Sequence, residues 1–185
     1  MVYLFLADGF EEIEALTPVD LLRRAGVAVT TVGVTGKTVT GSHGITVAAD
    51  VSAEEAIAAM HNGEAIDIEM IVLPGGMPGA ATLDASEVVD TFIDAAEKAN
   101  AYIAAICAAP MILGKRGLLN GKKATCFPGF EEHLHGAEYV STHTVTDGRH
   151  ITGQAMGAAT EFALALVKAL KGEGAAEELR AAVFA

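Results

Sequence analysis

Short apolar segments that alternate with amphipathic ones constrain the fold of this chain more than any other feature. Segments 2–7, 68–73 and 102–106 are almost wholly apolar, which is typical of strands buried on both faces of a sheet. Segments 11–25 and 86–99 instead place apolar residues at helical spacing. Strands of this kind, separated by helices, predict a mainly parallel sheet covered on both faces, the flavodoxin-like three-layer α/β/α sandwich.

The remaining segments extend this pattern. Segment 27–34 alternates as a further strand, and the glycines and β-branched residues of 35–50 predict a small β-hairpin appended to the main sheet. Further helices are expected over 53–60, 109–116 and 157–171, and short β segments over 123–125, 140–145 and 150–152. Pro18 cannot donate a hydrogen bond to the carbonyl group of Glu14, so we expect the first helix to be kinked or irregular there.

Composition narrows the class of protein. A length of 185 residues suits one domain over 1–185, and a hydrophobic fraction of 51% with only 19% charged residues predicts a large core. The formal net charge of −12 disfavours nucleic acid and anionic membranes as partners. No apolar run reaches the roughly 18 residues of a membrane-spanning helix, and the first residues lack a basic signal-peptide region. We therefore expect a cytoplasmic protein whose partners are small molecules or proteins.

The segment around Cys107 indicates chemistry. The cysteine follows the apolar segment 102–106 and precedes Ala108, Ala109 and Pro110, and a proline suits the first turn of a helix. A strand-to-helix elbow of this kind holds a nucleophile in a crowded backbone conformation that needs small neighbours. Free N–H groups at the start of a helix favour a negative charge, so we expect a reactive thiol with a lowered pKa. The alternative is a cysteine that only fills the core.

Further groups are expected beside the sulfur atom. Gly75 and Gly76 follow the apolar segment 68–73, and the carboxyl ends of parallel strands form the crevice of an open α/β sheet. The backbone amides of Gly76 and Ala108 could then bind an oxyanion, although an ordinary Pro-Gly-Gly turn is the alternative. If Glu14 on the first helix points inward, it would keep its proton beside an anionic sulfur and donate a hydrogen bond to it.

The chain resembles the ThiJ/PfpI superfamily, and in particular its DJ-one branch, in the segments LADGFEEIEALTPVDLLRRAG, VLPGG, IAAICAAP and ATEFALALVKAL, which occur in the family's order and spacing. The resemblance covers nearly the whole chain as one domain of the class I glutamine amidotransferase-like type. It implies a homodimer with a readily oxidised cysteine at Cys107 and a protonated partner at Glu14. It also implies oxyanion-binding positions at Gly75, Gly76 and Ala108. We expect neither a metal nor a cofactor.

Three departures from the family pattern modify this expectation. Phe127 stands where a member of the branch has a histidine near the cysteine, so one proton shuttle is missing. His43, where the branch often has an arginine, is a possible accessory residue. Ala108 replaces the histidine that protease-like members carry directly after the cysteine, which disfavours a peptidase. No histidine is followed two residues later by a glutamate, which disfavours a glutamine amidotransferase.

These observations lead to one functional hypothesis and two alternatives. The first is cysteine-dependent protection against reactive carbonyls and oxidants, with glutathione-independent glyoxalase or deglycase chemistry on methylglyoxal or its adducts. The second is a redox sensor or chaperone without turnover, which uses oxidation of Cys107. The third is a hydrolase or hydratase of another small substrate. Cys126, His133 and His135 are expected to be passive.

Overall fold

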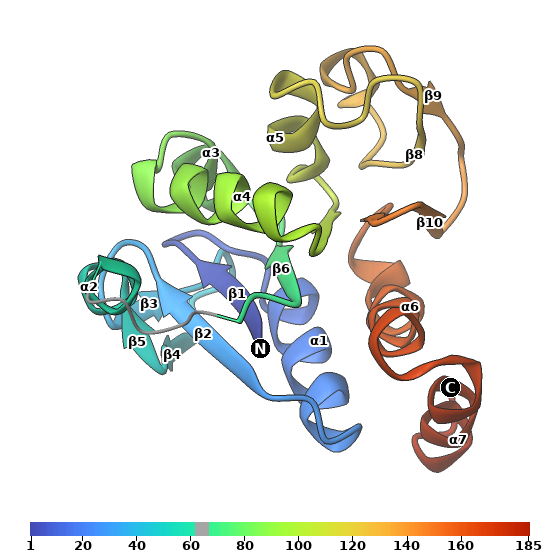
Figure 1. The fold of residues 1–185 in the computed structure, drawn as a ribbon, viewed down its shortest axis with the longest axis horizontal. Coiled ribbons are helices and arrows are strands. Elements are labelled where there is room, and N and C mark those ends of the chain that lie inside the picture. The colour runs from blue at the N-terminus through green and yellow to red at the C-terminus, as the bar shows by residue number, and fades with distance from the viewer. Residues whose placement is uncertain (62–66) are drawn as a thin grey trace.

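A seven-stranded sheet lies at the centre of the protein, whose computed structural model describes residues 1–61 and 67–185 (Figure 1). Its strands are β1 (Val2–Leu6), β2 (Val29–Gly33), β5 (Val51–Ser52), β6 (Met70–Leu73), β7 (Tyr102–Ile106), β10 (Thr144–Asp147) and β11 (His150–Gly153). Their order is β10-β11-β7-β6-β1-β2-β5, and neighbouring strands are parallel except for β10 and β11. The prediction of a mainly parallel sheet is confirmed.

Two smaller sheets flank the main one. Strands β3 (Thr38–Thr40) and β4 (Thr46–Ala48) form the antiparallel hairpin that the sequence predicts. Strands β8 (Lys123–Ala124) and β9 (Glu138–Tyr139) pair in parallel. The predicted strand over 140–145 is wrong in its boundaries, because the N–H group of Thr142 donates to the carbonyl of Val140 in a turn at 3.0 Å.

Helices cover both faces of the sheet and bury two separate apolar cores. They are α1 (Glu12–Arg24), α2 (Ala53–His61), α3 (Gly79–Asp84), α4 (Glu87–Ala99), α5 (Pro110–Lys115), α6 (Ala159–Lys171) and α7 (Glu173–Ala182), with 3-10 turns at Glu131–His133 and Met156–Ala158. In β1, Phe5 packs in the core beneath α2 to α5, whereas Leu4 and Leu6 pack in the core beneath α1 and α6. Successive side chains of a strand point to opposite faces, so the apolar runs serve both cores.

Helix α1 differs from its prediction. It continues through Pro18, and Glu14 lies within the helix, so the expected irregular segment at Glu14 is wrong and the expected kink stays a prediction. The carbonyl of Glu14 loses only one backbone donor to the proline, while Ala15, Val19 and Leu22 on the same helix are buried in the core. Packing of this apolar face holds the helix together across the missing hydrogen bond.

The three central strands point their carboxyl ends at the same edge of the sheet. Strand β6 pairs with both β1 and β7, with Val72 beside Leu4 and Ala104. The segments that follow these strands, 7–11, 74–78 and 107–109, therefore meet at that edge. Among the described residues, no helix combines the length and apolar character needed to cross a membrane.

Candidate functional site

Cys107 lies directly after β7 on a strained backbone elbow. Its φ is 66°, in the left-handed region that a residue with a side chain rarely adopts. Two hydrogen bonds fix this geometry: the N–H group of Cys107 donates to Gly153 O at 2.9 Å, and the N–H group of Phe127 donates to Cys107 O at 2.8 Å. The elbow that the sequence predicts is present, although α5 begins only at Pro110 and is six residues long.

Glu14 is fully buried and reaches this elbow from α1. Its Oε2 atom accepts a hydrogen bond from the N–H group of Gly75 at 3.0 Å. Its Oε1 atom has no hydrogen-bond partner of regular geometry within the described residues, and Cys107 is the side chain that interacts with this carboxyl group. A protonated Glu14 carries an O–H group that can serve as a hydrogen-bond donor beside the thiol.

Gly75 makes this approach possible because it has no side chain. A Cβ atom there would lie 2.6 Å from Glu14 Oε2 and 2.7 Å from Cys107 Cβ, both well inside van der Waals contact. The same glycine supplies the N–H group that holds Glu14. Gly75 thus positions the acid and the thiol against each other, a role distinct from the oxyanion binding that the resemblance implies.

Burial governs the protonation of this pair. Burial raises the pKa of Glu14 to about 7; hydrogen bonds from Cys107 and Gly75 lower it in part, and the negative charge of Glu11 raises it. Burial also raises the pKa of Cys107 to about 12, and the charge and hydrogen bonding of Glu14 act in the same direction. The two groups therefore resist carrying two negative charges.

The lowered thiol pKa expected from the sequence is wrong, because burial is the largest cause that raises the pKa of Cys107 to about 12. Repulsion by Glu14 disappears once the carboxyl group holds the proton, and its O–H group then favours the thiolate. Protonation of Glu14 thus removes one cause of the raised pKa, whereas the burial of Cys107 remains.

Backbone amides face the sulfur atom on its other sides. The N–H groups of Ala108 and Gly76 both donate toward Cys107 and lower its pKa. Gly76 has a φ of +86°, and a Cβ atom there would lie 2.3 Å from the backbone nitrogen of Glu11, so only glycine fits. Two N–H groups that converge on one point form the geometry of an oxyanion hole.

A pocket of about 190 Å³ opens beside Cys107. It is lined by Gly76, Met77, Cys107, Ala108, Phe127 and Phe130. Four of these residues are predicted at the site from the sequence, namely Gly76, Cys107, Ala108 and Phe127. Met77 and Phe130 are not predicted. Met77 follows the Gly75-Gly76 turn directly, and Phe130 lies beyond the Pro128-Gly129 turn, so only the path of these loops reveals them.

His43 lies in a different cluster, with Glu11 and Glu12. Its Nδ1 atom is 3.0 Å from Glu12 Oε2 and 3.5 Å from Glu11 Oε2, and its backbone N–H donates to Glu12 Oε1 at 2.8 Å. Burial alone would raise the pKa of Glu12, but the hydrogen bonds from His43 and Ile45 lower it to about 2. His43 is not among the residues that line the pocket beside Cys107.

The cluster of Glu11, Glu12 and His43 is the group of described residues whose ligand atoms could hold a metal ion, since these atoms lie within 4.8 Å of one another. The hydrogen bonds already satisfy Glu12 and tie α1 to the β3–β4 hairpin. His43 therefore has a structural role here, and its accessory role stays a prediction. Cys126 is buried, and burial raises its pKa to about 12.

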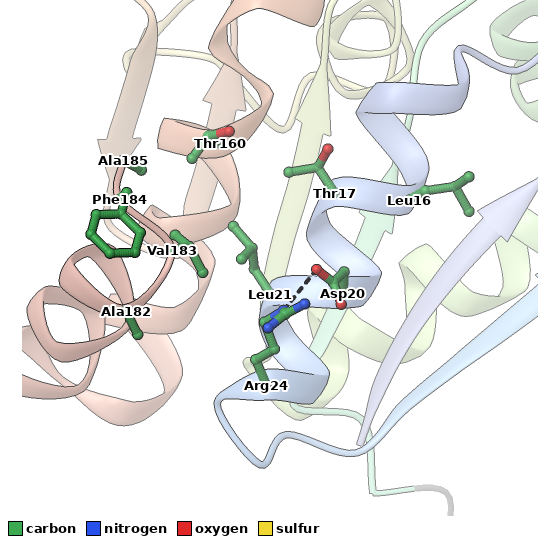
Figure 2. A pocket seen from close by; sticks show the side chains of 10 residues that line it. All are labelled: Leu16, Thr17, Asp20, Leu21, Arg24, Thr160, Ala182, Val183, Phe184 and Ala185. Carbon is green, nitrogen blue, oxygen red and sulfur yellow. Dashed lines mark hydrogen bonds and ion pairs between the residues drawn. The ribbon is translucent and has the colours of Figure 1, made fainter.

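A larger hollow of about 780 Å³ lies away from Cys107 (Figure 2). Side chains of α1, including Leu16 and Asp20, line one side, and the C-terminal residues 182–185 line the other. Arg24 lies on the same helix as Asp20, and its Nε atom is 2.8 Å from Asp20 Oδ2. None of the residues of the cysteine site borders this hollow, so its size does not mark the place of the chemistry.

The fold and the elbow together define an α/β sandwich protein with a cysteine at a strand-to-helix elbow. The sequence matches the DJ-1/PfpI family over residues 1–169. It is 36% identical to the Parkinson disease protein 7 homolog of Danio rerio, over 95% of this chain and 92% of the relative. It is 30% identical to a Pyrococcus abyssi protein named a deglycase, over 92% of this chain and 99% of the relative.

The solved structures agree with this assignment. The structure of oxidized DJ-1 from Toxoplasma gondii superposes with a TM-score of 0.90 at 31% identity, covering 99% of this chain and 97% of the other. Drosophila melanogaster DJ-1beta gives a TM-score of 0.89 at 32% identity, with 99% and 96% covered. The chain belongs to the DJ-1/PfpI family.

Proposed function

We propose that this chain protects against reactive carbonyls by converting 2-oxoaldehydes such as methylglyoxal into 2-hydroxy acids, with Cys107 as nucleophile and without glutathione. One observation carries the proposal: the sulfur of Cys107 lies among the amides of Gly76 and Ala108 and the buried carboxyl group of Glu14. The names of the family relatives, including the archaeal deglycase, support a DJ-1-type protective role in general.

The reaction follows from these groups and needs no external oxidant. The Cys107 thiolate adds to the aldehyde carbon, a C–S bond forms, and the oxygen takes up the electron pair of the broken π bond beside the two amides. The hydrogen on the aldehyde carbon is then transferred to the neighbouring ketone carbon, with Glu14 assisting proton transfer.

This shift leaves a thioester on Cys107. Water attacks its carbonyl carbon, the C–S bond breaks, and the hydroxy acid leaves as the thiol is restored. The sum is RCOCHO + H₂O → RCH(OH)COO⁻ + H⁺. One carbon is oxidised by two electrons while its neighbour is reduced by two, so the electrons balance within the substrate.

Lactate production from methylglyoxal tests this function. We expect turnover by the reduced wild-type protein, no turnover by Cys107→Ser, and a loss of roughly 10²-fold or more in Glu14→Gln, because general acid–base groups contribute on this scale. Cys126→Ala is the matched control, since that cysteine is buried outside the pocket. Absence of lactate from reduced wild-type protein would sink the glyoxalase proposal.

A redox sensor is the second candidate function. Cys107 is partly exposed, and its thiolate can attack a peroxide, forming an S–O bond as the O–O bond breaks and water or an alcohol leaves. A protonated Glu14 could donate a hydrogen bond to the new oxygen atom. Mass spectrometry after peroxide treatment should then find oxygen on Cys107 and not on Cys126, while turnover is absent.

We also propose that the protein acts as a cytoplasmic homodimer, as the family resemblance implies. The exposed apolar side chains of Ile13 and Leu16 on α1 support an interface on that helix. Light scattering should give twice the chain mass of 19.0 kDa. Leu16→Glu should shift the protein to the monomer, and a wild-type monomer at micromolar concentration would contradict the proposal.

A further inference from the structure

Among the described residues, none that lines the pocket beside Cys107 is an aspartate, glutamate, lysine or arginine. Its described lining consists of two aromatic rings, a methionine, the cysteine and the backbone of Gly76 and Ala108. An anion that entered this pocket would lose water without gaining an opposite charge, which is costly. The lining therefore bears on which electrophile can approach the sulfur atom.

Two phenylalanine rings form one wall of the pocket. Phe127 and Phe130 lie with ring centroids 6.4 Å apart at 78°, in the edge-to-face arrangement that aromatic pairs prefer. Phe130 in turn packs on the His133 ring at 5.9 Å. The hydrogen bond from the N–H group of Phe127 to Cys107 O ties the backbone of Phe127 to the elbow, so this residue lies beside Cys107.

The polar groups at the site gather around the sulfur atom. Glu14 and the amides of Gly76 and Ala108 all act on Cys107, and they suit the oxygen of a reacting carbonyl group. Phe127 is 43% exposed and Met77 53% exposed, so apolar surface remains open for a ligand. A substrate with a carbonyl at one end and an apolar group at the other matches both regions.

The volume indicates the size of the apolar group. An apolar cavity of about 150 Å³ holds a benzene molecule, and this open pocket measures about 190 Å³. A phenyl ring or a short alkyl chain therefore fits in the pocket beside Phe127 and Phe130. Binding of such a ring is favoured by aromatic contacts and by the removal of apolar surface from water.

We propose that this pocket selects neutral electrophiles that carry an aromatic or alkyl substituent, and in particular aryl 2-oxoaldehydes, over hydrophilic or anionic ones. Because this proposal concerns the class of substrate, it rests on the proposed function. With phenylglyoxal the balanced reaction is PhCOCHO + H₂O → PhCH(OH)COO⁻ + H⁺. The bonds at sulfur form and break as for methylglyoxal, and the phenyl group stays in the pocket.

Alkylation of Cys107 tests the selectivity without requiring turnover. The probes are iodoacetamide, N-benzyl iodoacetamide and iodoacetate, which each form a C–S bond as iodide leaves. Peptide-level mass spectrometry gives the rate at Cys107 alone, and each rate is divided by the rate of the same probe with a small-molecule thiol. The variants are Phe127→Ala and Phe130→Ala, with Met156→Ala, a 47% exposed residue outside the pocket lining, as control.

We expect the benzyl probe to react roughly tenfold faster than iodoacetamide after this normalisation, and iodoacetate roughly tenfold slower, since burying part of a ring or an unpaired charge acts on this scale. The preference for benzyl should fall in both phenylalanine variants and persist in Met156→Ala. Equal normalised rates for the three probes, or a preference that both phenylalanine variants retain, would overturn the proposal.

A turnover series separates this inference from the proposed function. The wild-type protein is given glyoxal, methylglyoxal and phenylglyoxal, and we expect kcat/KM to rise along that series. Turnover of methylglyoxal without any preference for phenylglyoxal overturns the selectivity and leaves the proposed function intact. Probe selectivity without turnover of any of the three supports the pocket inference while the glyoxalase function fails.

Discussion

Glu14→Gln should make the fold more stable at alkaline pH. The pKa of Glu14 rises from 4.5 to about 7 on folding, chiefly through burial. A carboxyl group whose pKa is raised in the folded protein binds its proton more tightly there than in the unfolded chain. The stability that this tighter proton binding contributes is fully present below pH 4.5. The fold loses it as the pH rises from 4.5 through 7.

The size of this effect follows from proton linkage. Each pKa unit corresponds to about 1.4 kcal/mol, so the difference between the folded and unfolded pKa gives a loss of about 3 kcal/mol between pH 4 and pH 8. Glutamine has nearly the shape of glutamic acid and does not titrate, and its carbonyl oxygen can still accept from the N–H group of Gly75. The variant should therefore lack this loss.

Urea denaturation at several pH values measures the effect. The free energy of unfolding of Glu14→Gln minus that of the wild type should grow by about 3 kcal/mol from pH 4 to pH 8. Glu12→Gln is the matched control on the same helix. Because the pKa of Glu12 is lowered to about 2, its contribution is present above pH 4.5 and lost in acid, so the control should show the opposite sign.

A stability difference between Glu14→Gln and wild type that does not change with pH would refute the reasoning. It would mean that Glu14 is solvated or paired in the folded protein despite its burial. Glu14 could then not hold the proton that it is proposed to donate toward Cys107. Stabilisation of the thiolate by Glu14 would be refuted as well.

Three further predictions concern other positions. Burial lowers the pKa of His150 from 6.5 to about 4, helped by the charges of Lys122 and Arg149. The free energy of unfolding of His150→Leu minus that of the wild type, measured in urea, should therefore grow by about 2 kcal/mol as the pH falls from 8 to 5. Gly75→Ala should slow iodoacetamide labelling of Cys107 at least tenfold and lower the free energy of unfolding by about 1–3 kcal/mol. The control Gly174→Ala, at a position with open space around it, should not lower the stability measured by thermal unfolding. Asp50→Asn should cost about 1 kcal/mol in urea, because Asp50 Oδ2 accepts from both the N–H and hydroxyl groups of Thr31 at 2.8 Å.

Much of the fold was predictable because it depends on local pattern. Strand β7 and the end of β6 lie at the predicted residues, since an apolar run bounded by turn residues leaves the backbone few alternatives. Helices α3 and α7 were not predicted. The first has six residues, too few to show a helical period, and the second has a polar composition in which Ala176 and Leu179 are the buried residues.

The limits of local pattern are clearest at Pro18 and at Glu14. A proline is a strong local signal against regular helix, yet α1 continues through it because its apolar face packs into the core. The inward orientation of Glu14 was predicted as a condition, and only the packed structure shows that its carboxyl group is buried against Gly75 and Cys107.

The sequence by itself determined the parallel sheet, the cysteine elbow and the glycine turn beside it, because each depends on residue type and spacing along a few neighbouring positions. Only the tertiary structure decided that His43 pairs with Glu12 and not with the cysteine, and that Phe130 and Met77 complete the pocket. These contacts join segments that lie far apart in the chain. Their geometry depends on how helices and loops pack around the sheet, which spacing along the sequence does not encode.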